Sequence, residues 1–253
     1  DLLATSFFFS FADKLSVKAA FTWLDIAEQT KGKILADIFD ELTKLDTLLT
    51  FKDGSSAFIA DFSSTFSFEK KLNTEVSKVK KIGSKWSVEA NGECGEFDKV
   101  VLCTPSFVSS RLLKDEDETL CELLKNIEYS PLAVISLAYD NLPHDMDGFG
   151  IVNSKRSNAK SLGIVWDSSI DDKCAPDGKK LIRVIVGGQR EPFLPLKQEN
   201  ELIDIATGAI SDMMGVYEEP MLNHITRWHK AIPNYEVGHK ELVGQILDRA
   251  RKL

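Results

Sequence analysis

The sequence of 253 residues contains no Gly-x-Gly-x-x-Gly motif, so it lacks the signature of a turn that holds a dinucleotide pyrophosphate. It has no uncharged apolar run of about 18 residues, so no transmembrane helix is expected. Its four cysteines form no C-x-x-C pair and its four histidines no H-E-x-x-H motif, so no metal site is expected. Scattered thiols of this kind are typical of a reducing compartment.

Basic residues are fewer than acidic ones. There are 31 Lys and Arg residues against 39 Asp and Glu, which gives a net charge of -8 and a pI near 5.2. A protein that binds nucleic acid needs a basic face for the phosphates, so we expect no nucleic-acid partner. The length allows one large domain or two small ones with a substantial core.

The first 50 residues have helical periodicity. Apolar residues recur at spacings of three and four, at Phe21, Leu24, Ile34, Leu35, Ile38, Phe39, Leu42, Leu45 and Leu48. The run Phe7-Phe8-Phe9 is interpreted as core or as the wall of an apolar pocket, with a membrane-facing patch as the alternative.

The next segment mixes helix and strand. A turn at Lys52-Asp53-Gly54 precedes a short helix, and two alternating stretches, 75–82 and 86–90, predict a hairpin joined at Gly83-Ser84. Asn91-Gly92 is a second hairpin-type turn. The apolar run 100–105, which ends at Thr104-Pro105, predicts a buried strand, and two short helices follow within 106–127.

The second half is rich in strands. We expect strands at 133–140, near 149–152, 161–166 and 181–187, and near 221–229. Helices are expected over 202–214, with Gly215 as C-cap, and from about 237 to 252. Strand-rich and helix-rich stretches alternate without a simple βαβ rhythm. The fold class predicted is mixed, α+β or α/β, with an antiparallel sheet and segments interleaved between domains.

Several polar positions in this half have two interpretations. Asp167, Ser168 and Ser169 follow a strand, where such side chains usually satisfy backbone groups. Arg183 alternates with Ile185 on one strand face, where it could pair with a ligand carboxylate or form a structural ion pair. His239 is expected to be a capping or core residue rather than a catalytic base.

Taken in order, a series of short blocks resembles the FAD-dependent protoporphyrinogen/coproporphyrinogen oxidases of the flavin amine-oxidase superfamily. The blocks are Gly148-Phe149-Gly150, Gly163–Ser169, Arg183–Gly188 and the stretch from Arg227-Trp228 through Ile232-Pro233-Asn234-Tyr235 to Gly238-His239. Lys14–Phe21 and the pair Glu28 and Gly32 resemble the start of the family's helical domain more loosely. Asn234 stands where the family has Gln.

The resemblance implies a set of site residues. The Val76 backbone would meet the adenine of FAD, and Trp228 would lie near the flavin. Phe149, Gly150, Ile151 and Ile185 would line the porphyrinogen pocket. Spacing alone favours a core residue for Val76 and a tight turn with a core Phe for the Gly148–Gly150 block. No catalytic side chain is identified.

The implied organisation has four segments. Residues 1–50 would form a helical substrate-channel or membrane-facing segment, 51–128 part of the FAD-binding domain, 129–226 the substrate-binding sheet, and 227–253 a return to the FAD-binding domain. The chain is expected to be an internal part of a longer flavoenzyme, without both flavin-binding ends and inactive alone.

The implied activity is oxidation of a porphyrinogen to the porphyrin in haem synthesis, with dioxygen as acceptor. Two alternatives stay open: an amine-oxidase-like flavoprotein with another substrate, and a non-catalytic homologue that acts as a binding partner. We expect a cytoplasmic or organelle-interior location rather than secretion, with peripheral membrane contact and a homodimer both left open.

Overall fold

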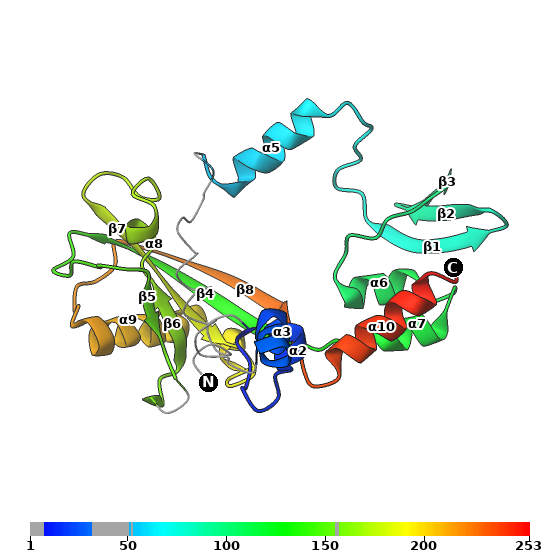
Figure 1. Cartoon of the computed structure of the whole chain (residues 1–253). Coiled ribbons are helices and arrows are strands. Elements are labelled where there is room, and N and C mark those ends of the chain that lie inside the picture. Colours follow the sequence, from blue (N-terminus) through cyan, green and yellow to red (C-terminus); the bar gives the residue numbers. More distant parts are fainter. Residues whose placement is uncertain (1–7, 32–50, 52, 155–156) are drawn as a thin grey trace. The chain divides into compact units, whose positions relative to one another are not determined.

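A computed structural model describes residues 8–31, 51, 53–154 and 157–253 (Figure 1). The chain divides into two compact units. Unit 1 comprises residues 1–20 and 128–237, and unit 2 comprises residues 21–127 and 238–253. Each unit is built from segments that are distant in sequence, as the predicted interleaving requires.

Unit 1 is built on a five-stranded antiparallel sheet in the order β5-β6-β7-β4-β8. Its strands are β4 (Tyr129–Asp140), β5 (Gly150–Val152), β6 (Ser161–Val165), β7 (Lys179–Gly187) and β8 (Leu222–Pro233). Burial alternates along the central strands: Ile182, Val184 and Val186 of β7 are fully buried, while the residues between them are not. One face of this sheet therefore carries the core.

Helix α9 (Glu199–Met214) covers that face (Figure 1). It buries a stripe spaced by four residues, Leu202, Ala206, Ile210 and Met214. The Gln198 N–H donates to Glu201 Oε2 at 3.3 Å at its start, and Gly215 ends it with φ 66°. The helix and the glycine cap were both predicted and are confirmed.

A polar network fixes residues 8–16 to unit 1. Ser10 Oγ donates to Gln189 Oε1 at 2.7 Å, and the Phe11 N–H donates to the same oxygen at 3.1 Å. Gln189 Nε2 donates in turn to Glu236 Oε1 at 2.9 Å. The short elements α2 (Val17–Ala20), α8 (Asp167–Ile170) and η2 (Leu194–Leu196) complete the unit.

Unit 2 contains a three-stranded meander, β1 (Val76–Ile82), β2 (Lys85–Ala90) and β3 (Glu93–Phe97). Gly83 lies in the first turn, and Asn91 and Gly92 form the second with φ values of 50° and 82°. Positive φ at both central positions is the requirement of a type I′ hairpin turn. Both predicted turns are therefore confirmed.

The helices of unit 2 are α3 (Thr22–Lys31), α5 (Ser55–Thr65), α6 (Ser106–Leu112), α7 (Glu118–Lys125) and α10 (His239–Ala250). Its core is a small cluster around Val79, Leu112, Leu120 and Cys121. The Asp117 carboxylate caps α7 by accepting from the Leu120 N–H at 2.9 Å, and Arg249 of α10 donates to the same carboxylate at 2.5 Å. One acidic side chain thus links two helices of the unit.

The predicted fold class is confirmed, but the strand predicted at 100–105 is wrong. Residues 100–105 form no strand, and Val101 is 83 % exposed. A strand requires a neighbour for its backbone hydrogen bonds, and no strand of the described residues pairs with this stretch. The helix expected after Pro105 is present as α6.

The ends of the predicted segments also differ from the units. The predicted boundary at 226/227 lies inside β8, because that strand continues to Pro233. Unit 1 extends to Val237. In the predicted helical segment 1–50, α2 and α3 are present, while Phe7 and residues 32–50, including Gly32, lie outside the described residues.

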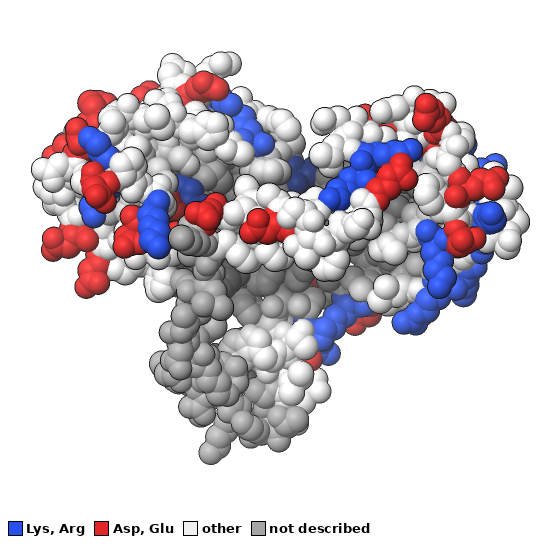
Figure 2. Space-filling view, turned by 90° about the horizontal axis from the view of Figure 1, so that it is seen from above, with Lys and Arg blue, Asp and Glu red and all other residues white. Residues whose placement is uncertain are grey.

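The surface shows charges of both signs. Figure 2 shows acidic and basic side chains interspersed on the face in view, with uncharged areas between them. In the part of the chain that the structure describes, no helix is long and apolar enough to cross a membrane.

Candidate functional site

An apolar hollow of about 200 Å³ lies in unit 1, at the β5–β6 end of the sheet. It is lined by Phe9, Phe149, Gly150, Ile151, Val152, Leu162, Gly163, Ile164, Val165, Ile170 and Ile185. The hollow therefore contains all four residues predicted to meet the substrate, contributed by β5, by the residue before it, and by β7. None of the lining side chains is titratable.

Two glycines let β5 lie close to β6. A Cβ on Gly150, which has φ 141°, would come within 2.0 Å of the Ile164 carbonyl oxygen. A Cβ on Gly163 would come within 2.7 Å of the Ile151 carbonyl oxygen. No other residue fits at either position without movement of the backbone. Phe149, held by a 2.9 Å hydrogen bond from the Trp166 N–H to its carbonyl, is 63 % exposed.

The other two predicted pocket residues are held differently. Ile185 is half-buried on β7, on the face opposite the buried Val184 and Val186. Ile151 pairs with the buried Ile164 and packs against the core cluster as well as lining the hollow. Ile151 is thus both a core residue and a wall of the hollow.

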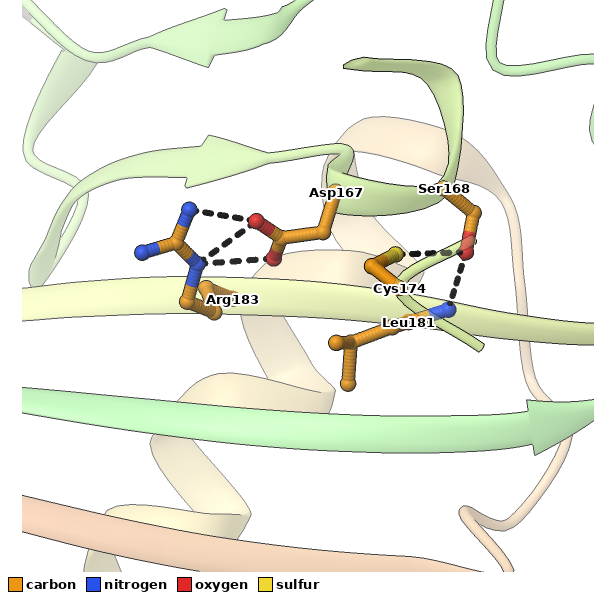
Figure 3. Close-up of polar contacts among 5 residues, drawn as sticks. All are labelled: Asp167, Ser168, Cys174, Leu181 and Arg183. Carbon is orange, nitrogen blue, oxygen red and sulfur yellow. Dashed lines mark hydrogen bonds and ion pairs between the residues drawn. The ribbon is translucent and has the colours of Figure 1, made fainter. Parts of the chain in front are cut away.

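An ion pair lies beside the hollow, where β6 passes into α8 (Figure 3). Arg183 Nε donates to Asp167 Oδ2 at 2.7 Å and to Oδ1 at 2.8 Å, and Nη2 donates to Oδ1. The hydrogen bond that Arg183 donates to the Asp167 carboxylate raises the pKa of Arg183. The Asp167 side chain is 12 % exposed and that of Arg183 is 44 % exposed. The structural ion pair that the sequence allowed is therefore present.

The serines of this turn serve the backbone, as predicted. Ser168 Oγ accepts from the Leu181 N–H at 2.8 Å and lies 3.7 Å from Cys174 Sγ (Figure 3). Ser169 Oγ donates to the Met146 carbonyl. Burial raises the pKa of the Cys174 thiol, which disfavours a reactive thiolate.

Val76 lies at the start of β1, an edge strand of the meander in unit 2. The Asn91 N–H donates to the Glu75 carbonyl at 3.3 Å, so Glu75 and Asn91 form a hydrogen-bonded pair. Val76 and Ala90 are then a non-hydrogen-bonded pair. The N–H and C=O of Val76 consequently face the open edge of the sheet, and the Val76 side chain packs on the small core.

This arrangement fits one end of a flavin dinucleotide. An edge backbone with a free donor and acceptor side by side can bind the edge of an adenine ring. The sequence has no glycine-rich turn for the pyrophosphate. Among the residues present, Val76 would hold the adenine, and Trp228, which is 56 % exposed on the edge strand β8, offers a large apolar surface. Both roles stay predictions.

The remaining predicted positions have structural environments. His239 begins α10 after Gly238, and burial lowers its pKa, which favours the neutral imidazole. Asn234 is buried and accepts from Ser130 Oγ at 2.7 Å. In the described part of the chain no group of three or more His, Cys, Asp or Glu side chains could hold a metal ion.

Sequence reasoning did not assign several residues that line the hollow. These are Val152, Leu162, Gly163, Ile164, Val165 and Ile170. Nothing in their local pattern distinguishes them from ordinary strand or core residues. Phe9 also lines the hollow, and the aromatic run around it was interpreted as core or the wall of a pocket. The aromatic run therefore indicated a pocket wall as one of its interpretations, but it did not identify which pocket Phe9 would line.

No family model matches the chain. Among solved structures, the fold is shared with a protein from Exiguobacterium sp. 255-15 whose given name is "putative protoporphyrinogen oxidase". That match has a TM-score of 0.80 and 19% identity, and covers 94% of this chain and 52% of the other. Wild-type putrescine oxidase bound to putrescine matches with a TM-score of 0.59 and 15% identity, over 74% of this chain and 43% of the other. The fold is thus that of the flavin amine-oxidase superfamily.

Relatives found by sequence indicate a smaller group of proteins within this fold. Coproporphyrinogen III oxidase of Bacillus subtilis is 27% identical over 68% of this chain and 37% of its own length. Chloroplastic protoporphyrinogen oxidase of Nicotiana tabacum is 24% identical over 89% of this chain and 47% of its own length. The chain is a homologue of the protoporphyrinogen/coproporphyrinogen oxidases, and the resemblance stated above is confirmed. It spans about half the length, or less, of these relatives.

Proposed function

We propose that the protein containing this chain oxidises a porphyrinogen to the porphyrin in haem synthesis, with FAD as cofactor and dioxygen as acceptor. The observation that carries the proposal is the apolar hollow of unit 1. It brings together Phe149, Gly150, Ile151 and Ile185, the four residues that the family resemblance assigns to substrate. Homology to enzymes named for both porphyrinogen substrates supports the reaction class.

The described residues suit binding rather than proton transfer. A porphyrinogen presents a broad apolar ring, and a wall of aliphatic and aromatic side chains removes that surface from water. Gly150 and Gly163 let β5 and β6 lie close together, and both strands form walls of the hollow. FAD, when bound, supplies the hydride acceptor, so the chain need provide no acid–base pair in the hollow.

The same proposal gives each unit of the chain a binding role. Unit 1 would bind the substrate, and the meander of unit 2 would contribute the adenine contact through Val76. The porphyrinogen partner, the lack of a nucleic-acid partner, peripheral membrane contact, a homodimer and a non-secreted location are further predictions of this proposal.

The test uses the protein made from its complete natural coding sequence. The purified protein is expected to contain FAD. Under anaerobic conditions, coproporphyrinogen or protoporphyrinogen should bleach the flavin absorption, whereas putrescine should not. Bleaching by an amine alone would assign another substrate, and a protein without flavin would indicate a non-catalytic homologue. Either result overturns the proposal.

A matched pair of variants connects the activity to the hollow. Phe149→Ala removes an aromatic wall and should lower kcat/KM for the porphyrinogen roughly tenfold. Phe193→Ala removes an equally large side chain of the same unit, 77 % exposed and outside the hollow, and should leave kcat/KM unchanged. Equal effects of the two variants would show that the hollow does not bind the substrate.

A further inference from the structure

The open face of the unit 1 sheet carries a row of polar side chains beside the hollow. Strand register places Arg183 of β7 opposite Ser136 of β4, and Ser136 opposite His224 of β8. On its other side Arg183 is opposite Val165 of β6, which lines the hollow. Directly opposed residues share a face and have Cα atoms about 4.5–5.5 Å apart. The row therefore runs outward from the rim of the hollow.

Arg183 is immediately next to the hollow in two directions. Val165 is its cross-strand neighbour, and Ile185 follows it by two residues on the same face of β7. Both of these neighbours line the hollow. A ligand that fills the hollow and extends along the sheet would therefore meet the Arg183 guanidinium first.

The ion pair with Asp167 uses only one edge of that guanidinium. Nε and Nη2 donate to the carboxylate (Figure 3), and Nη1 makes no hydrogen bond to Asp167. Among the described residues, no hydrogen bond is made by Nη1 of Arg183 or by Oγ of Ser136. Asp167 offsets the positive charge of Arg183, but it also fixes the plane of the guanidinium. The remaining N–H donors of Arg183 therefore point in a fixed direction.

We propose that Arg183, with Ser136 beside it, binds a carboxylate of the ligand whose apolar body lies in the hollow. This inference rests on the proposed function, under which the carboxylate bound by Arg183 is a propionate of the porphyrinogen. Asp167 is a positioning residue, because it acts through Arg183 and not on the ligand. The site requires an apolar ring and a carboxylate in one molecule, which distinguishes it from a general anion site.

The test measures binding of two stable porphyrins to the full-length protein by fluorescence titration. One probe is coproporphyrin III, and the other is the same ring with its propionates converted to neutral amides. Wild-type protein should bind the acid about tenfold or more tightly than the amide, because the amide loses the charge-assisted hydrogen bond, and the free energy of such a bond corresponds to about that ratio of affinities.

Arg183→Met removes the fork but leaves Asp167 unpaired, so the double variant Arg183→Gln with Asp167→Asn is measured beside it. Both variants that fold should lose the preference for the acid, while amide binding stays unchanged. Ser136→Ala should reduce the preference a few-fold. The matched control is Lys179→Met. Lys179 lies on β7, like Arg183, but outside the hollow, and it pairs with Asp140 of β4. This variant should retain the full preference.

The outcomes separate this inference from the proposed function. If wild-type protein binds acid and amide equally well, or the double variant keeps the preference, the hollow binds the ring and the carboxylate site is wrong. If wild-type protein binds neither porphyrin, the proposed function fails and this inference fails with it.

Discussion

The two units bury their apolar residues to very different degrees. Unit 1 has a continuous core in which Ile135, Leu137, Ile182, Val184 and Leu202 are fully buried between the sheet and α9. Among the described residues of unit 2, five buried side chains form the core cluster. Helix α5 has no buried residue, and its Phe58, Ile59 and Phe62 are 44 %, 64 % and 51 % exposed.

This difference shows where local structure depends on packing. The sheet of unit 1 has a helix to cover one face, so its strands match their sequence pattern closely. In unit 2 the meander forms from its own turns, whereas the stretch around Val101 and helix α5 keep their apolar side chains in water. Exposed apolar side chains that lie together, as on α5, are typical of surfaces that bind another chain segment or a partner.

The largest expected effect compares the two cores with one substitution. Leu137→Ala in unit 1 should lower the free energy of unfolding by about 3–5 kcal/mol, since its neighbours are fixed on all sides. Leu120→Ala in unit 2 should cost about 2–3 kcal/mol, because a small cluster collapses more easily around the cavity. Hydrogen exchange resolved by peptide would report each unit separately. Equal losses would remove the distinction between the cores.

A smaller effect separates glycines that need their lack of Cβ from one that does not. Gly150→Ala should destabilise unit 1 by about 1–3 kcal/mol, because the new Cβ would clash with the Ile164 carbonyl and φ is positive. Gly208→Ala in α9 meets nothing within 4 Å and should stabilise the helix by about 0.5–1 kcal/mol. Denaturant titration of both variants gives the sign. Neutral behaviour of Gly150→Ala would mean that β5 can move away.

The smallest effect concerns Asp117 in unit 2. The hydrogen bond from Arg249 lowers the pKa of Asp117 below its ordinary 3.8, and the bond from the Leu120 N–H acts in the same direction. Its stabilisation is therefore complete above about pH 4 and is lost as the pH falls through the lowered pKa. Asp117→Ala should cost about 1 kcal/mol at neutral pH through loss of the cap.

The matching control for this pH effect is a carboxylate outside the core. Asp248→Ala removes an exposed acid that pairs with Arg251 in the same unit and should change stability by less than about 0.5 kcal/mol. Thermal unfolding between pH 3 and pH 7 would compare the three proteins. If Asp117→Ala kept the wild-type acid dependence, the ion pair with Arg249 would have no stabilising role.

Much of the fold was predictable because its signals are local. The hairpin turn at Gly83, the turn at Asn91-Gly92 and the cap at Gly215 each depend on a conformation that few residues adopt. The run 100–105 shows the limit of such reasoning. Its composition is that of a buried strand, but a strand forms only when it pairs with a neighbouring strand. The local sequence does not predict which strand, if any, will be that neighbour.

The candidate site was predictable in part for the same reason. Alternation along β7 placed Arg183 and Ile185 on one face, and the structure bears this out. The pairing of Arg183 with Asp167, and the position of Ser136 opposite Arg183, depend on strand order and register. A two-residue period cannot specify which strands become neighbours.

Phe9 gives the hollow a property that its other walls do not share. Every other lining residue falls between 149 and 185, whereas Phe9 comes from a segment far away in sequence that is held by Gln189 through Ser10 and Phe11. A molecule bound in the hollow would contact Phe9 only while that segment is docked. By mass action a ligand that contacts Phe9 would favour the docked state, so binding of a ligand should increase the protection of residues 8–16.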